Sequence, residues 1–228
     1  MCIRDRSIDE EIEANKAASE FLQRLRELII EKRRRPANDL LSHLIEQQCC
    51  DDGPTDREIL CVSILLLNAG HEATVHQLGN SIVRLLQTPP SITQWWKDVA
   101  TVDAVVAECM RFDAPLHLFT RFAQEKLALA DDVTIYAGTE IALLLGAANR
   151  CPHQFANADV FTPERSDLNH VSFGAGLHFC VGAPLARLEL RIALSVLFDR
   201  LPGMQLQSPP LYRDSFHFHG LEAVNVSW

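Results

Sequence analysis

The stretch "HVSFGAGLHFCVGAPLARLEL", residues 170–190, places one cysteine between a glycine-rich loop and the start of a helix. Pro184 follows Cys180 at a position where the first helical turn tolerates a missing N–H. The free N–H groups and the positive end of the helix dipole therefore lie close to the sulfur and favour its thiolate form. Glycines let the loop fold tightly around it. The sequence predicts an anionic cysteine, which serves as a nucleophile or as a metal ligand.

Three simpler interpretations of the cysteines and histidines remain open on residue chemistry alone. Cys180 could pair with His178 as a nucleophile and its base, or it could be a buried structural cysteine. The latter leaves the glycines, His178 and Phe173 at their spacings unexplained. A zinc site at His217 and His219 is the third alternative, but their spacing is that of alternate strand residues and no second ligand pair stands at a finger-like distance.

The composition of the whole chain excludes several classes of protein. Its 228 residues are 47% hydrophobic, and the net charge of −9 lacks the basic field that nucleic acids or anionic membranes require. The seven cysteines include no C-x-x-C pair, which suits a reducing cytoplasm. No run reaches the roughly 18 consecutive apolar residues of a membrane span, and the N-terminus has no apolar signal region. We expect a cytoplasmic protein that binds neither nucleic acid nor membrane.

Hydrophobic periodicity predicts a mainly helical fold with a small β region. The expected helices cover residues 10–33, 38–48, 55–87, 101–113 and 184–201. The third opens with a Thr55-x-x-Glu58 capping box and is apolar nearly all round, so we expect it to run through the interior. Strand-like alternation follows at 126–148, with turns at Asp131-Asp132 and Ala137-Gly138, and again in the tail at 214–228.

The cysteine stretch carries a family resemblance. The pattern Phe173-Gly174-x-Gly176-x-His178-x-Cys180-x-Gly182 resembles the haem-ligand loop of the cytochrome P-450 family, the haem-thiolate monooxygenases. The resemblance implies haem b as the cofactor, Cys180 as the axial iron ligand and His178 as a hydrogen-bond donor to a haem propionate. Cysteine ligation in this family favours cleavage of the O–O bond.

Other motifs match the same family in order along the chain. Glu108-x-x-Arg111 in "AECMRF", with Arg165 of "FTPERSD", resembles the buried Glu–Arg network that holds the proximal side of the haem. Arg121 in "HLFTRFA" stands where the family has a second propionate-binding residue. The segment "AANRCPHQF" resembles an Asn-Arg-Asp-Pro-x-x-Phe element, with Cys151 in place of the aspartate.

The segment "LLLNAGHEATVHQLGN" resembles the distal helix that crosses above the haem. Ala69 and Gly70 there leave room for oxygen. The usual acid–alcohol pair falls on Glu72 and Ala73, so the hydroxyl is missing. Thr74 lies about 100° further round the helix and cannot simply replace it. We therefore expect protons to come from ordered water or a substrate hydroxyl, with Glu72 as a more remote relay.

The resemblance runs from residue 14 to Trp228 and corresponds to the C-terminal half of a bacterial-type member, so the expected fold is an incomplete cytochrome P-450 fold. Residues 1–13 are expected to be a non-native or truncated leader, and 14–228 the haem-binding part of one catalytic domain.

The implied function is insertion of one oxygen atom from O2 into a small apolar substrate, with electrons from a ferredoxin and ferredoxin reductase. Arg187 and Arg191 are candidate docking charges for that donor, and Leu116, Leu118 and Phe119 are candidate substrate contacts. The alternative is a non-catalytic remnant that binds haem weakly or not at all.

Overall fold

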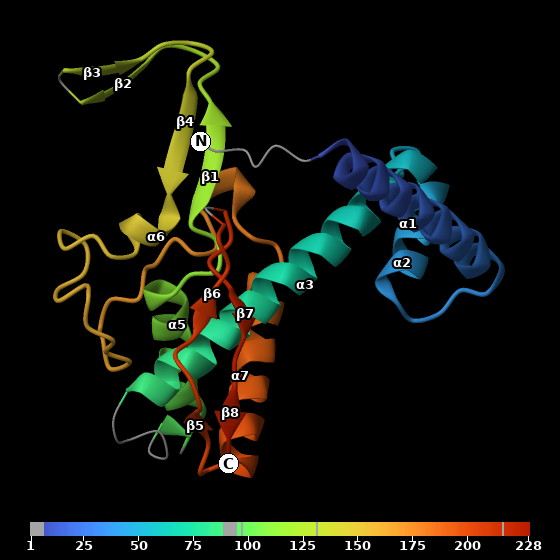
Figure 1. The fold of residues 1–228 in the computed structure, drawn as a ribbon. Helices are drawn as coiled ribbons and strands as arrows, with labels where there is room; N and C mark the ends of the chain where they lie inside the picture. Colours follow the sequence, from blue (N-terminus) through green and yellow to red (C-terminus); the bar gives the residue numbers. More distant parts are fainter. Residues whose placement is uncertain (1–6, 89–94, 97, 131, 216) are drawn as a thin grey trace. The chain divides into compact units, whose positions relative to one another are not determined.

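A computed structural model describes residues 7–88, 95–96, 98–130, 132–215 and 217–228, and the chain divides into two compact units, Met1–Ala69 and Gly70–Trp228 (Figure 1). Helix α3 contributes to both. Asp131 of one expected turn lies outside the described residues, as do residues 1–6 of the expected leader.

The first unit is a helical hairpin packed beside the first part of α3. Helix α1 (Ile8–Arg34) begins with a capping box in which Ser7 and Glu10 satisfy each other's backbone N–H groups. It is followed by α2 (Leu40–Glu46) and the short 3-10 helix η1 (Gln47–Cys49). Both helices predicted for this region are confirmed. Their apolar faces meet α3 in a small core of Leu25, Ile29, Ile59 and Leu60.

Helix α3 (Asp56–Gln87) is the longest element, and it begins as expected. The hydroxyl of Thr55 accepts the Glu58 N–H at 3.3 Å, and the Glu58 carboxylate accepts the Thr55 N–H at 2.7 Å. Among the described residues this is the one helix whose length and hydropathy would suffice for a membrane span, with a mean hydropathy of 1.3 over 18 residues. Its second part, however, is built into protein: Asn80 and Ser81 are fully buried.

The main core of the second unit lies between three helices. Helices α5 (Val99–Phe112) and α7 (Ala183–Arg200) pack against each other, and the end of α3 covers them. Leu85 of α3, Val105 of α5 and Leu194 of α7 are all fully buried there. The interior position expected for α3 is therefore confirmed for its end, whereas Leu65 and Leu67 near its middle are exposed.

Four two-stranded antiparallel sheets make up the β structure of the described chain. Strand β1 (Leu118–Phe122) pairs with β4 (Glu140–Leu144), and β2 (Leu127–Ala130) pairs with β3 (Val133–Ile135). In the tail, β5 (Gln205–Leu206) pairs with β8 (Val226–Ser227), and β6 (Leu211–Tyr212) with β7 (Leu221–Ala223).

Two local predictions differ from the structure. The strand-like pattern was expected to run to residue 148, but Leu145–Ala148 form a helical turn, α6. This turn holds Asn149 in place, because the Asn149 N–H donates to the Leu145 carbonyl at 3.0 Å. Strand β1 was not predicted, since its five residues pair with a strand that lies some twenty residues further along the chain.

Candidate functional site

The loop around Cys180 is closed by backbone hydrogen bonds. The Cys180 N–H donates to the Phe173 carbonyl at 2.9 Å, and the Ala183 N–H donates to the Cys180 carbonyl at 3.2 Å. Gly174 and Gly176 have φ angles of 71° and 65°, a region that side-chain-bearing residues rarely adopt. The predicted need for glycine at these two positions is therefore confirmed.

Helix α7 starts directly behind the cysteine. Gly182 is its N-cap, Pro184 stands in its first turn, and the free N–H groups of that turn face the loop end. A Cβ atom at Gly182 would stand 3.8 Å from Cys180 Sγ, so the sulfur lies against this glycine. The positive end of the α7 dipole is thus adjacent to the thiol, as the sequence predicted.

Phe173 anchors the other end of the loop. Its side chain is buried in the main core, and the Arg187 guanidinium lies 4.6 Å from the centre of its ring. His170 and Phe179 lie against the same ring, at 5.9 Å and 6.2 Å between centroids. Burial, followed by the neighbouring Arg187, lowers the pKa of His170 to about 4, so this imidazole is neutral at physiological pH.

The outer surface of the loop is apolar. Leu177 is fully exposed, and Val181 and Phe179 are 85% and 50% exposed on either side of the partly buried Cys180. Single exposed apolar residues are common, but three around one thiol form a patch that calls for an apolar ligand. A Cβ atom at Gly176 would meet nothing within 4 Å. One sulfur ligand in an apolar, sterically open surface fits a haem, whose macrocycle is flat and largely apolar.

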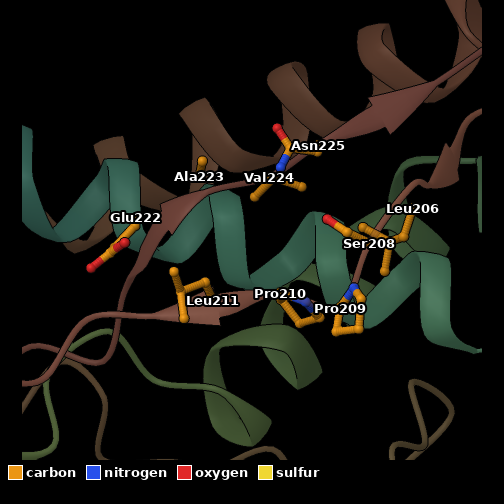
Figure 2. Close-up of a pocket in the computed structure, with 9 residues that line it drawn as sticks. All are labelled: Leu206, Ser208, Pro209, Pro210, Leu211, Glu222, Ala223, Val224 and Asn225. Atoms are coloured by element: carbon orange, nitrogen blue, oxygen red, sulfur yellow. The ribbon is translucent and has the colours of Figure 1, made fainter.

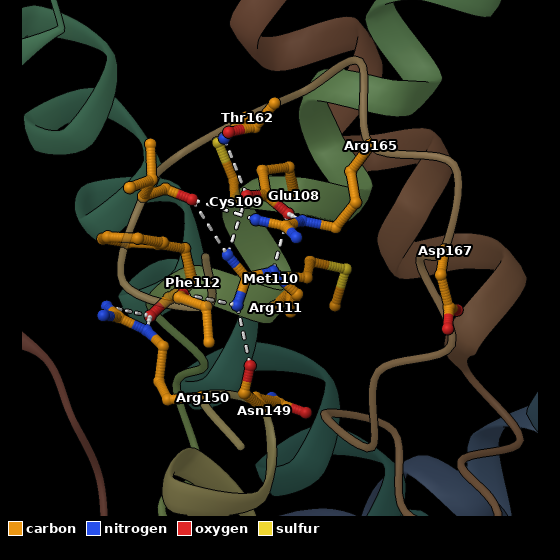
Figure 3. A network of polar contacts seen from close by, with 12 residues as sticks. Glu108, Cys109, Met110, Arg111, Phe112, Asn149, Arg150, Thr162, Arg165 and Asp167 are labelled. Atoms are coloured by element: carbon orange, nitrogen blue, oxygen red, sulfur yellow. Dashed lines mark hydrogen bonds and ion pairs between the residues drawn. The ribbon is translucent and has the colours of Figure 1, made fainter. Parts of the chain in front are cut away.

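A buried ion pair stands at the centre of the second unit (Figure 3). Glu108 and Arg111, one turn apart on α5, are both fully buried, and their two hydrogen bonds measure 2.7 Å and 2.8 Å. Arg111 Nη1 also donates to the carbonyls of Asn149 and Ala158. Such a bidentate, fully satisfied pair holds its neighbours in fixed positions.

Arg165 completes this network, as the family resemblance implied. Its Nε lies 3.4 Å from Glu108 Oε2, and its Nη1 donates to the Ala156 carbonyl at 2.6 Å. Glu108 Oε1 further accepts the backbone N–H of Thr162 at 2.8 Å. The carboxylate of Glu108 therefore ties α5 to the segment that carries Arg165.

Asn149 connects the ion pair to the cysteine loop, and sequence reasoning missed this role. Its side chain accepts the Val171 N–H and donates to the Ser172 hydroxyl, both at 2.8 Å. The Ser172 hydroxyl in turn donates to the Met110 carbonyl at 2.7 Å. The segment that enters the loop is thus fixed to α5. The resemblance of "AANRCPHQF" was the available signal, but it did not say which residue in that segment makes the connection.

The two residues expected to bind the haem propionates, His178 and Arg121, lie on different elements of the second unit. His178 is exposed in the short 3-10 helix η2 (Gly176–His178). Arg121 lies on β1, where its Nη1 donates to the Thr120 carbonyl at 2.8 Å. Within the described part of the chain, no hydrogen bond or ion pair links Arg121 to His178 or Cys180. Their expected role depends on a ligand between them.

The residues predicted on the distal helix occupy successive positions of α3. Gly70 opens the second unit, and a Cβ atom there would meet nothing within 4 Å. Glu72 is half exposed, while Ala73 and Thr74 are partly buried. Ala69 is the last residue of the first unit. The space at Gly70 matches the expectation of small residues here.

Two cavities among the described residues lie outside this loop. One, of about 290 Å³, is lined by residues 206, 208–211 and 222–225 of the tail and holds a single carboxylate, Glu222 (Figure 2). The other is a groove of about 450 Å³ between α5 and α7, where Arg191 lies 3.3 Å from Asp103. Neither brings together acid, base and nucleophile, so the cysteine loop remains the candidate site.

Cys109 and His219 are packed among other side chains outside this loop. Burial raises the pKa of the Cys109 thiol to about 12, which makes it a poor ligand. His219 stacks between His117 and Tyr212, with ring centroids 4.4 Å and 4.5 Å apart. Among the described residues, no group of three or more His, Cys, Asp or Glu side chains could hold a metal ion.

Known proteins are similar in sequence to this chain. The sequence profile described as "Cytochrome P450" matches residues 94–202. The biotin biosynthesis cytochrome P450 of Bacillus subtilis is 38% identical over 217 residues, which are 95% of this chain and 54% of that protein. The cytochrome P450 monooxygenase PikC of Streptomyces venezuelae is 35% identical over 96% of this chain and 54% of its own length. The chain spans about half the length of the curated relatives it matches.

Solved structures share the fold. The crystal structure of P450BioI in complex with an acyl carrier protein carrying hexadec-9Z-enoic acid superposes with a TM-score of 0.90 at 38% identity, over 98% of this chain and 57% of that one. CYP109E1 from Bacillus megaterium in complex with corticosterone gives 0.90 at 32% identity, over 99% and 61%. Since residues 94–202 match the family profile and nearly the whole chain is similar in sequence and structure to members of this family, which binds haem b, this chain belongs to the cytochrome P450 family.

Proposed function

We propose that the chain is the haem-binding part of a haem-thiolate monooxygenase that inserts one oxygen atom from O2 into a small apolar organic substrate. The observation that carries this proposal is the Cys180 loop, closed on Phe173 and followed by the N-terminus of α7. Bound haem would be held through its iron by Cys180 and would supply the redox chemistry that activates O2.

The residues of the candidate site each have a proposed task around the haem. The loop amides and the start of α7 stabilise the Cys180 thiolate, and the open position at Gly176 lets the loop approach a flat ring. Arg121 and His178 bind the propionates. Glu108, Arg111 and Arg165 act through the backbone, because they fix the segments that enter the loop.

On the opposite side, α3 supplies the proton path. Gly70 and Ala69 leave room for O2 beside the helix, and Glu72 relays protons from solvent, to which it is half exposed. Ala73 provides no hydroxyl, so ordered water or a substrate hydroxyl carries the proton further. A test is Ala73→Thr: product yield per electron on the true substrate should stay unchanged or fall, whereas Glu72→Gln should cripple it. A large gain from Ala73→Thr would contradict this assignment.

We further propose a ferredoxin with its reductase as electron donor and a cytoplasmic location. Of the two candidate docking charges, Arg187 is exposed beside Phe173, whereas Arg191 already pairs with Asp103. Arg187 is therefore the better candidate for an acidic donor surface. Leu116, Leu118 and Phe119, all partly buried on or before β1, are proposed as substrate contacts.

The decisive experiment is an absorption spectrum of the purified chain, reconstituted with haem, reduced and exposed to carbon monoxide. A Soret band at the long wavelength typical of thiolate ligation, lost in Cys180→Ser and retained in Cys151→Ser, supports the proposal. Absence of haem uptake, or a band typical of a neutral thiol or histidine, means that this chain alone is a non-catalytic remnant.

A further inference from the structure

His76 is a buried histidine that the proposed function does not use. It lies on α3 with its side chain only 5% exposed. Within the described residues, its Nε2 atom has no hydrogen-bond partner. A buried polar atom without a partner costs free energy, so such an atom at a functional site calls for a specific explanation.

The nearest carboxylate to His76 belongs to Glu72. The two residues are four positions apart on α3, and Glu72 Oε1 lies 3.8 Å from His76 Nε2. Side chains at this spacing lie on the same face of a helix. Glu72 is 49% exposed whereas His76 is buried, so the pair connects solvent with the interior of the second unit. A small rotation of the exposed Glu72 side chain would bring the two atoms within hydrogen-bond distance.

The C-terminal tail fixes the orientation of the imidazole ring. A Cβ atom at Gly220 would stand 2.1 Å from His76 Nδ1, so the tail backbone covers that edge of the ring. The Phe218 ring lies 5.5 Å from the imidazole, centre to centre. Asn80 on α3 holds the tail there by donating to the His219 carbonyl at 2.8 Å. Nε2 is the ring nitrogen that faces Glu72, at 3.8 Å from Oε1.

The next residue after Glu72 offers it no support. Ala73 has no polar side-chain atom, and Thr74 projects from a different face of the helix. A flexible, half-exposed carboxylate that must deliver protons at a defined place needs a group that holds it. His76 is the one ionisable side chain within 4.0 Å of Glu72 in the part of the chain described.

We propose that His76 is the positioning residue of Glu72, holding its carboxylate on the α3 face and exchanging a proton with it between Nε2 and Oε1. The proposal rests on the monooxygenase function and extends it, because it names the group that prepares the proton relay. The exchange moves one proton and changes no other bond. When Nε2 takes the proton from the Glu72 acid, an imidazolium and a carboxylate remain, and the proton returns from Nε2 to that carboxylate.

The first test needs no haem. In the 228-residue chain, the 15N shift of His76 Nε2 reports the tautomer of the ring and the hydrogen bonding at this atom. Replacing Glu72 by glutamine removes the carboxylate that lies 3.8 Å from Nε2 and should therefore move this 15N shift. The exposed control Glu222→Gln should leave it unchanged. An unchanged shift in Glu72→Gln would overturn the proposal.

The second test uses the haem-loaded protein and the product formed per electron consumed. His76→Asn should lower this yield severalfold, and adding His76→Asn to Glu72→Gln should lower it no further, because the two act as one unit. His71→Asn, an exposed neighbour, is the matched control and should leave the yield unchanged. Independent, additive losses would contradict the pairing.

The experiments distinguish failure of the monooxygenase proposal from failure of the His76 proposal. If the reconstituted wild-type chain shows no thiolate spectrum, the monooxygenase function of this chain fails, and the 15N measurement still decides whether His76 and Glu72 are paired. If the spectrum is formed but the 15N shifts ignore Glu72→Gln, the function stands and the positioning role of His76 is wrong.

Discussion

At the scale of single residues, the cysteine loop owes its position to groups that never touch the sulfur. Arg111 bonds to the Asn149 carbonyl, and the Asn149 side chain bonds to Val171 and Ser172 at the entrance to the loop. Arg111, Asn149 and Ser172 are buried, so water does not readily replace the hydrogen bonds that they make to one another. Loss of one member leaves the others unsatisfied in a region of low dielectric constant.

Arg111→Ala should therefore destabilise the chain by about 3 to 5 kcal/mol, because it leaves the Glu108 carboxylate buried with less compensation. Arg191→Ala is the matched control, since the Arg191–Asp103 pair is 34% and 53% exposed and should contribute at most about 1 kcal/mol. Urea unfolding followed by circular dichroism measures both. Similar losses of stability in the two variants would show that the buried pair contributes no more than the exposed pair.

Gly220 is a position that has no room for a side chain. Gly220→Ala places a methyl group 2.1 Å from His76 Nδ1, so the ring or the tail must move, at a cost of about 1 to 3 kcal/mol. Gly203→Ala meets nothing within 4 Å and should be neutral. Thermal unfolding compares the two. In a His76→Ala background the cost of Gly220→Ala should shrink, and an undiminished cost would place the clash elsewhere.

At the scale of elements, the loop segment that precedes Cys180 is sensitive to acid. His170 Nδ1 accepts the Ser172 N–H at 3.3 Å, which requires the neutral ring, and burial lowers the pKa of His170 to about 4, from a usual value of about 6.5. The folded state therefore binds fewer protons than the unfolded state between these two values. The contribution of His170 to the free energy of unfolding is fully present above pH 6.5. It falls as the pH drops towards 4 and stays constant below that.

The expected loss across this window is on the order of 2 kcal/mol, after allowance for partial solvent exposure of the ring. Urea unfolding at several pH values measures it. His170→Gln, which retains an acceptor but does not titrate, should flatten the curve, whereas the same change at the exposed His43 should not. An equally steep curve in His170→Gln would assign the acid sensitivity to other groups.

The elements also show how far sequence reasoning reaches. Helices with an apolar period and a capping signal, such as α3 after Thr55, were predicted within a few residues, because their hydrogen bonds are local. The cysteine loop was predicted because its glycines are required by its own backbone. Strand β1 and the Asn149 connection were missed, because each exists only when segments far apart in the sequence meet.

At the scale of the whole molecule, apolar surface remains uncovered along α7. Leu185, Leu188, Ile192 and Val196 follow one another at helical spacing, and each is between 40% and 58% exposed. A contiguous stripe of this kind exceeds the scattered apolar residues of an ordinary surface. The described neighbours of α7 leave this stripe uncovered. The curated relatives are about twice as long as this chain.

The isolated chain should therefore bind the apolar dye ANS in its folded state. The double variant Leu185→Gln/Ile192→Gln replaces the two most exposed residues of the stripe. It should lower the dye fluorescence at least about twofold, with helical circular dichroism unchanged. Leu129→Gln, at an exposed leucine on β2, is the control and should have little effect. Equal fluorescence in the double variant would mean that the dye binds elsewhere, for example at the cysteine loop.

The two compact units have separate cores, and this determines how damage spreads through the chain. Ile59 belongs to the core of the first unit and Leu194 to that of the second, and neither residue is more than 1% exposed. Truncating either to alanine should cost about 2 to 5 kcal/mol locally. Because the cores share no buried side chain, the effects should add in the double variant to within about 0.5 kcal/mol.

Hydrogen exchange read by mass spectrometry checks this segment by segment. Ile59→Ala should speed exchange in α1 and α2 while peptides from 170–200 keep their protection, and Leu194→Ala should do the reverse. The haem-binding loop would then depend on the second unit alone. If Ile59→Ala also exposed the amides of the cysteine loop, α3 would be transmitting the loss between the units, and the site would require the first unit to be intact.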